Sequence, residues 1–355
     1  KAIELGAEGL KEIKVDSAWA DLSVEQVVEQ PNLPKFVKEI ANPVNAIKGY
    51  DLPVSVFNDF VDGTMAPGSA AYEKRYIAQF VPVWNSDNCI QCNQCSFSCP
   101  HAVIRPFLVT PEEEAKAPKN ASYIPANGKG LEGLKFTIQI SAADCTGCEV
   151  CVNTCPGKKG NKALSMAPID EVIHQGKDKT ATYFFENVSY KSDLVDITAN
   201  AKNSQFAQPL FEFSGACGGC GETPYVKLVT QLFGDRMIVA NATGCSSIYG
   251  GSFPATPYTV NKEGKGPAWA NSLFEDNAEF GYGMRMATET LRDRIGVIME
   301  QAVANCESAE SEVKELFQAW LAHRDSGEET KKIAKKLIPL LEASKCDTAK
   351  EILKL

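Results

Sequence analysis

Eight of the thirteen cysteines fall into two runs of identical spacing. The first run reads CIQCNQCSFSCP from Cys89 to Pro100, and the second reads CTGCEVCVNTCP from Cys145 to Pro156. Thiolates separated by two residues can surround one iron-sulfur cube while nearby backbone N–H groups point at its sulfides. A repeat of all four spacings with a terminal proline therefore predicts two [4Fe-4S] sites.

The pattern also predicts how the eight thiolates are shared. In bacterial ferredoxins the fourth cysteine of each run binds the cluster of the other run. One cluster is then expected to take Cys89, Cys92, Cys95 and Cys155, and the other Cys145, Cys148, Cys151 and Cys99. This exchange would hold the two runs together and keep the clusters close enough for electron transfer.

Two other uses of these cysteines remain open. Zinc also binds paired CxxC sequences, but one ion needs only four ligands and does not require two full runs with exchanged partners. Disulfides are typical of small secreted domains, whereas a chain of 355 residues can bury its own core.

Three further cysteines follow a change of character after residue 190. The pattern predicts a strand at Leu210–Phe213, a helix from Thr223 to Gly234 and a strand at Arg236–Asn241. In such a parallel crossover, ligands bind at the carboxyl ends of the strands. Cys217, Cys220 and Cys245 fall at those ends and make an incomplete ligand set, which Cys306, Cys346 or a residue outside the chain would complete. Cys306 and Cys346 lie in helical patterns, and we expect both to be small buried apolar residues.

The remaining segments supply the surrounding structure. Between the cysteine runs, residues 103–140 form an insertion that ends in a half-buried strand at Leu134–Ile140 and covers one side of the module. The other expectations are a helix with Ser23 as N-cap, a helix at Lys35–Ala41, an extended segment at Asp51–Phe57, a turn-rich loop at Asp62–Ser69 and helices at Met286–Ala304, Glu310–Leu321 and Glu328–Leu341. Lys158–Lys162 is a basic loop, either simply solvated or a docking point for an acidic redox carrier.

Composition narrows the class of protein. The net charge of −9 and the lack of a basic stripe argue against nucleic-acid binding. No apolar stretch reaches the roughly 20 residues needed to span a membrane, so we expect a cytoplasmic protein. The chain begins at Lys1, so targeting information at a true N-terminus cannot be read.

Three motifs carry a resemblance to a known family. They are CGGCGE at Cys217–Glu222, TGCSSIYG at Thr243–Gly250 and the long GPAWANSLFEDNAEFGYGM at Gly266–Met284. Together with the tandem cysteine runs, they make essentially the whole chain resemble pyruvate:ferredoxin (flavodoxin) oxidoreductase. The resemblance implies a thiamine diphosphate enzyme that oxidatively decarboxylates pyruvate with coenzyme A to acetyl-CoA. Electrons would pass through three [4Fe-4S] clusters to ferredoxin or flavodoxin, and the enzyme would be a homodimer.

The resemblance also implies roles and boundaries in this chain. Cys217, Cys220 and Cys245 would bind the cluster next to thiamine, with a fourth ligand beyond Leu355. Glu222 and the loop residues Thr243, Gly244, Cys245 and Ser246 would line the thiamine pocket. The implied fold is a multidomain α+β and α/β protein. Its segments are the tail of a preceding domain (1–31), a small domain associated with coenzyme A (32–73), a ferredoxin-like domain with two clusters (74–190) and the first part of a thiamine diphosphate domain with a helical insertion (191–355).

The chain departs from the family in what it lacks. No GDG sequence, which in the family holds the magnesium and diphosphate, occurs here, and neither do the family's N-terminal domains. We therefore expect an internal fragment that does not turn over pyruvate alone, with no catalytic residue assigned. A stand-alone ferredoxin-type carrier and an oxidoreductase for another 2-oxo acid are the alternative functions.

Overall fold

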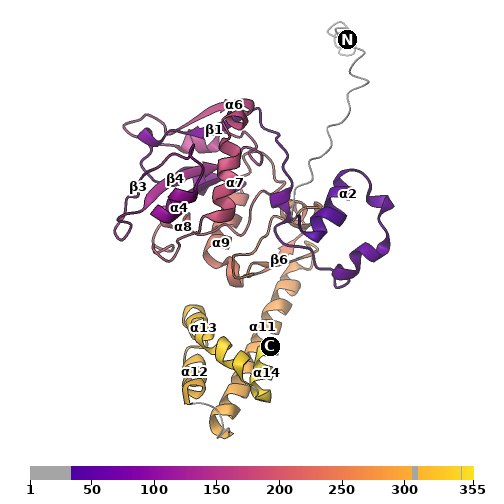
Figure 1. Cartoon of the computed structure of the whole chain (residues 1–355). Coiled ribbons are helices and arrows are strands. Elements are labelled where there is room, and N and C mark those ends of the chain that lie inside the picture. Colours follow the sequence, from indigo (N-terminus) through magenta and orange to yellow (C-terminus); the bar gives the residue numbers. More distant parts are fainter. Residues whose placement is uncertain (1–32, 306–310, 345) are drawn as a thin grey trace. The chain divides into compact units, whose positions relative to one another are not determined.

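The computed structural model describes residues 33–305, 311–344 and 346–355, and the chain divides into two compact units between Val56 and Phe57 (Figure 1). In the first unit, a helical segment begins after Pro34 and continues through a π-helical stretch, Val37–Ala41, into α2 (Asn42–Asn45). This confirms the helix expected at Lys35–Ala41. The helix with Ser23 as N-cap lies outside the described residues.

The extended conformation expected at Asp51–Phe57 is wrong. Gly49–Asp51 and Val54–Phe60 form 3₁₀ turns instead. The fixed φ of Pro53 suits the start of a helical turn as well as an extended chain, so proline alone did not distinguish them. The following loop does turn, with Thr64 donating its amide and hydroxyl hydrogens to the Asp62 carboxylate at 3.0 and 2.7 Å.

The cysteine runs lie in a module built from two small antiparallel sheets. β1 (Phe80–Trp84) pairs with β5 (Leu164–Pro168), so the strand before the first run meets the strand after the second. The second sheet has the order β2 (Ile104–Val109), β4 (Lys135–Ile140), β3 (Ile124–Pro125). β4 confirms the strand expected at Leu134–Ile140. Within the insertion, α4 (Pro111–Lys116) starts with a capping box between Thr110 and Glu113.

The core of the module is continuous with the cysteine sites. Val81, Ile104, Phe136 and Leu164 are buried together with Cys99, Cys145 and Cys151. A second core, around Phe107, forms where α7 (Lys177–Asn187) packs against β4; α6 (Ile169–His174) precedes it (Figure 1). The cysteines are therefore held by a packed scaffold and not by a loose loop.

Residues 201–272 differ from the expected strand–helix–strand crossover. α8 (Ala201–Ser204) and α9 (Thr223–Phe233) are helices, and Gly234 ends α9 as predicted. Leu210–Phe213 is not a strand, because it forms only an isolated bridge between Phe211 and Tyr258. The parallel partner of β6 (Ile238–Ala242) is instead β7 (Ala268–Ser272), which lies within the Gly266–Met284 motif.

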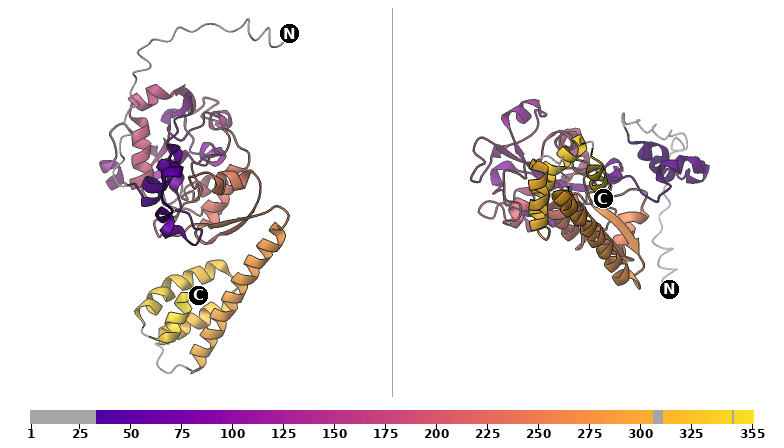
Figure 2. Two further views of the ribbon diagram at one scale, coloured as in Figure 1. Left: turned by 90° about the vertical axis from the view of Figure 1, so that its right-hand side faces the viewer. Right: turned by 90° about the horizontal axis from the view of Figure 1, so that it is seen from below.

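The C-terminal stretch is helical, as expected, with one helix more than predicted. α11 (Asn277–Asn305), α12 (Ser311–Ala322), α13 (Gly327–Ala343) and α14 (Asp347–Lys354) pack side by side (Figure 2). Their shared core includes Met299, Phe317, Trp320, Leu337 and Ile352. Ser326 caps α13 by accepting a hydrogen bond from the Glu329 amide, at the predicted break.

Candidate metal centres

Two cavities bring the eight cysteines of the runs together in the expected groups of four. Cavity A is lined by Cys89, Cys92, Cys95 and Cys155, and cavity B by Cys99, Cys145, Cys148 and Cys151. Each cavity thus takes three cysteines from one run and the fourth from the other. All eight thiols are free of disulfides.

The two runs adopt the same backbone conformation at matching positions. Gln91 and Asn93 have positive φ angles of 57°, and the corresponding Gly147 and Glu149 have 67° and 61°. This left-handed conformation turns backbone amides toward the sulfur atoms. The Gln91 amide donates to Cys89 Sγ and the Gly147 amide to Cys145 Sγ, each at 3.4 Å. The repeated spacing therefore encodes a repeated cradle.

Short helices join the two halves. α3 (Gln94–Ser98) carries Cys95 and α5 (Val150–Thr154) carries Cys151, and the two helices contact each other. Ser98 and Thr154, which precede the fourth cysteine of each run, lie 3.2 Å apart between their hydroxyl oxygens. This contact places each fourth cysteine next to the opposite cavity.

The thiols are crowded and poorly hydrated. Burial and, more weakly, the neighbouring Cys99 and Cys148 raise the pKa of Cys145 to about 12, although the hydrogen bond from the Gly147 amide lowers it. Burial and nearby cysteines likewise raise the pKa of Cys89, Cys95 and Cys151. Four thiolates so close together need a positive centre to balance them. A cluster of iron ions would supply that balance.

The linings of the cavities suit an iron-sulfur cube. The hydroxyl of Thr146 at cavity B is buried without a partner among the described residues, and the buried indole N–H of Trp84 at cavity A faces the Cys89 thiol. Both can donate to a sulfur atom. In the described part of the chain, no three cysteine, histidine or acidic side chains converge closely enough to hold a single metal ion. A cube has a different requirement, since its four cysteines bind four different irons.

The third cysteine set is more open. Cys217 and Cys245 are exposed and Cys220 is half-buried. Cys217 and Cys220 lie on one loop, whereas Cys245 begins α10 (Cys245–Ser247). The loop lies against the second cysteine run, because a Cβ atom on Gly219 would be 3.6 Å from that of Cys148.

His101 links this loop to cavity B. The ring is buried, with Nδ1 3.1 Å from the Ser214 carbonyl oxygen and Nε2 3.3 Å from the Cys217 carbonyl oxygen. Burial lowers its pKa. His101 follows Cys99 by two residues, so a cysteine of cavity B and Cys217 are joined by one buried side chain.

The residues predicted to line a thiamine pocket lie on neighbouring loops. Glu222, Thr243, Gly244 and Cys245 are exposed, and Ser246 is half-buried. Burial raises the pKa of Tyr249, one turn after Cys245, and the nearby Glu222 and Cys220 raise it further. The two loops are thus close enough to interact electrostatically.

The Gly266–Met284 motif fixes the loop that starts at Thr243. The Asn271 side-chain oxygen accepts hydrogen bonds from Asn241 at 2.8 Å and Ser247 at 2.9 Å. The Thr243 hydroxyl donates to the Ser272 carbonyl at 3.0 Å. Two of the motifs that carry the resemblance therefore support each other.

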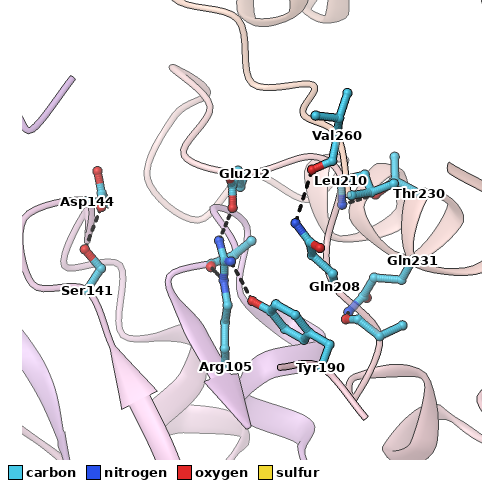
Figure 3. Close-up of polar contacts among 12 residues, drawn as sticks. Arg105, Ser141, Asp144, Tyr190, Gln208, Leu210, Glu212, Thr230, Gln231 and Val260 are labelled. Carbon is cyan, nitrogen blue, oxygen red and sulfur yellow. Dashed lines mark hydrogen bonds and ion pairs between the residues drawn. The ribbon is translucent and has the colours of Figure 1, made fainter. Parts of the chain in front are cut away.

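Several buried polar residues had not been predicted. Arg105 pairs with Glu212 and donates to the Tyr190 hydroxyl at 2.8 Å (Figure 3). Lys227 lies fully inside, although its neighbours in α9 are apolar. A charged residue within an apolar helical run was the only sequence signal, and it was ambiguous because such residues are usually exposed.

The predictions for Cys346 and Cys306 have different outcomes. Cys346 is exposed at the N-cap position of α14, so the expectation that it is buried is wrong. The start of a helix places it at the surface and away from the core of α11 to α14. Cys306 lies outside the described residues. Among the helices that are described, none combines the length and apolarity needed to cross a membrane.

Comparisons with known proteins agree with this geometry. A 4Fe-4S dicluster domain model matches residues 88–159, and a model described as a domain of unknown function matches residues 23–78. The chain is 49% identical over 340 residues to pyruvate:ferredoxin oxidoreductase from Moorella thermoacetica and 47% identical over 344 residues to pyruvate-flavodoxin oxidoreductase from Enterobacter agglomerans. These matches cover 96% and 95% of this chain but only 28% of each relative. Mitochondrial pyruvate dehydrogenase [NADP(+)] from Euglena gracilis is 45% identical over 329 residues, which cover 92% of this chain and 18% of that protein.

Proposed function

The chain is a homologue of the pyruvate:ferredoxin (flavodoxin) oxidoreductases, and from this premise we propose that it is the electron-relay part of such an enzyme. The complete enzyme would oxidatively decarboxylate pyruvate with coenzyme A to acetyl-CoA and carbon dioxide. The observation that carries the proposal is the pair of four-cysteine cavities with exchanged ligands. Clusters bound there would supply one-electron transfer.

The protein's own residues would hold and shield these clusters. Backbone amides at Gln91, Gly147 and Ala163 donate to cysteine sulfur atoms at 3.3 to 3.4 Å, which lowers the cost of negative charge on them. The packed core around the sheets buries Cys99, Cys145 and Cys151. On this proposal Cys89, Cys92, Cys95 and Cys155 bind one cluster, and Cys145, Cys148, Cys151 and Cys99 bind the other.

We assign the region around Cys217, Cys220 and Cys245 to the end of the electron relay next to thiamine diphosphate. Cys217, Cys220 and Cys245 would bind a third cluster with a fourth ligand from outside this chain. Glu222 and Thr243 to Ser246 would line a thiamine diphosphate and Mg²⁺ site in an α/β domain spanning 191–355. Contact between the Cys217–Cys220 loop and the second cysteine run supports this order.

The remaining segments complete the proposal. Residues 74–190 would be the ferredoxin-like domain, 32–73 a small domain associated with coenzyme A, and 1–31 the tail of a preceding domain. The match of a domain model to residues 23–78 is consistent with a separate unit there. The complete enzyme would be a cytoplasmic homodimer, and this segment alone would not form acetyl-CoA from pyruvate.

The acceptor would dock beside cavity A. Lys158, Lys159 and Lys162 are exposed on the turn that follows Cys155, a cysteine of that cavity. An acidic ferredoxin or flavodoxin would be attracted to this basic loop. Replacing Lys158 and Lys159 by glutamate should slow electron transfer to the carrier and weaken its salt dependence, while the iron content stays the same.

The experiment that tests the function uses the chain after anaerobic cluster reconstitution. The protein is reduced with dithionite, desalted and mixed with oxidised ferredoxin or flavodoxin in a stopped-flow instrument. We expect rapid oxidation of the iron-sulfur absorbance with equal reduction of the carrier. Transfer no faster than to an unrelated redox protein of equal potential would contradict the proposal.

A stand-alone ferredoxin-type carrier is the second candidate, favoured because all eight cysteines of the two cavities lie within residues 74–190. Unlike the complete enzyme, such a carrier would not need the Thr243–Gly250 and Gly266–Met284 motifs. An oxidoreductase for another 2-oxo acid is the third. Binding of thiamine diphosphate once the missing segments are supplied would exclude the carrier, and turnover with a panel of 2-oxo acids would identify the substrate.

A further inference from the structure

Helix α9 buries its polar face and exposes much of its apolar face. Thr223, Lys227 and Thr230 are at most 1% exposed, whereas Tyr225 is 71% exposed. Helices that cover a core normally do the reverse. This helix contacts α8 and α3, the short helix that carries Cys95 and ends just before Cys99. Polar groups of α3 must therefore form hydrogen bonds with this buried face.

The C-terminal end of α3 provides the reason. The last carbonyl groups of a helix have no partner within the helix. The Lys227 ammonium donates to the carbonyl oxygens of Ser96, Phe97 and Cys99, the last two at 3.1 Å. Its three hydrogens are all used, and all bind the backbone that connects a ligand of cavity A to a ligand of cavity B.

Lys227 has no carboxylate among these partners. It is buried, and the ionisable groups that act on it are Cys99, Arg105 and Cys95. Arg105 is already compensated by Glu212. A buried charge is normally paired. The negative groups that face this ammonium are cysteines assigned to the two clusters.

We propose that Lys227 is a positioning residue whose buried positive charge balances both clusters and raises their reduction potentials. A cluster with four thiolates is negatively charged, and it becomes more negative when it takes up one electron. A fixed cation nearby favours the reduced form. The effect should be larger for the cluster in cavity B, because Lys227 bonds to the carbonyl oxygen of Cys99. The inference rests on the proposed function, since it requires the two clusters.

The test compares Lys227→Gln, Lys227→Met and Lys227→Arg in the full chain, purified anaerobically. Reduction potentials are measured by EPR-monitored titration, with iron and sulfide analysis beside it. In the neutral variants we expect the one-electron reduction constant of the cavity B cluster to fall at least tenfold, which is about 59 mV. The cavity A cluster should shift less. Lys227→Arg should keep potentials near those of the wild type.

Lys191→Gln is the matched control. Lys191 is 9% exposed and pairs with Glu113 at 2.7 Å, so it is a buried lysine whose contacts include no cysteine. Its loss should leave both potentials unchanged. If the neutral Lys227 variants lose their clusters while Lys227→Arg retains them, the requirement for a cation is equally supported.

Two results would overturn the inference alone. One is unchanged potentials in neutral variants with full cluster content, which would leave Lys227 with a packing role. The other is equal loss of clusters in Lys227→Arg and in the neutral variants. If the wild-type chain itself binds no iron-sulfur cluster, the proposed function is wrong, and this inference is then wrong as well.

Discussion

The tandem-cysteine module and the region from Ser214 to Gly251 offer cysteines in opposite settings. In the module, Cys99, Cys145 and Cys151 are 5 to 7% exposed, and each cavity has four cysteines from this chain. In the second region Cys217 and Cys245 are exposed, and the described chain supplies three. The difference indicates that a site built wholly within one segment can be read from spacing and closed by local packing. In the other region the described residues leave the cysteines open to solvent.

The largest expected difference between the regions is in metal content. Cys151→Ser removes a ligand from cavity B, so bound iron should fall by about four of roughly eight atoms, counting four per cube. Cys217→Ser should leave those eight in place. Iron and acid-labile sulfide analysis after anaerobic purification measures both. Equal losses in the two variants would remove the distinction between closed and open sites.

The next effect concerns the stability contributed by the contact between the tandem-cysteine module and the segment that follows it. Glu212 is the carboxylate partner of the buried Arg105. Removing it in Glu212→Ala leaves an uncompensated buried cation and should lower the free energy of unfolding by about 3–5 kcal/mol. The matched control is Glu114→Ala, an exposed pair with Lys135, where about 0.2–1 kcal/mol is expected. Denaturant unfolding compares them, and similar values would argue against a structural role for the buried pair.

A smaller effect should depend on pH within the insertion of the module. Burial tends to raise the pKa of Glu113, but hydrogen bonds from Lys191, Thr110 and Ser189 outweigh it and lower the pKa to about 2. The stabilisation is then fully present above the ordinary pKa near 4.5 and is lost as the pH falls toward 2.

Glu113→Gln should therefore be less stable than the wild type at pH 7, by about 1.5 kcal/mol. That difference should begin to shrink below pH 4.5. Denaturant unfolding at pH 7, 5 and 4 follows it, with the fully exposed Glu112→Gln as the control. A difference that stays constant down to pH 4 would show that another interaction is responsible.

The smallest effect is expected on the exposed apolar face of the open region. Tyr225 is 71% exposed, so Tyr225→Gln should change the free energy of unfolding by less than about 0.5 kcal/mol. Phe211, buried beneath the same loops, should cost about 3–5 kcal/mol when replaced by alanine. A large loss for Tyr225→Gln in denaturant unfolding would mean that this face is covered within the chain.

The same contrast explains what the sequence could predict. Cysteine spacing is a local code, so the groups around cavities A and B were predicted in full. The strand at Leu210–Phe213 was not, because its pattern carries no information about the partner that Phe211 meets, Tyr258. Lys227 was missed because the open carbonyl groups that it satisfies belong to a helix some 130 residues earlier. A hydrogen bond between residues far apart in the sequence leaves no periodic pattern in either segment.

The most direct test of the account is metal and sulfide analysis with EPR on the anaerobically purified chain. Two cubes in adjoining cavities should give about eight iron and eight sulfide per chain, with a reduced signal broadened by magnetic interaction between them. Zinc in place of iron, without inorganic sulfide, would contradict the account at its base.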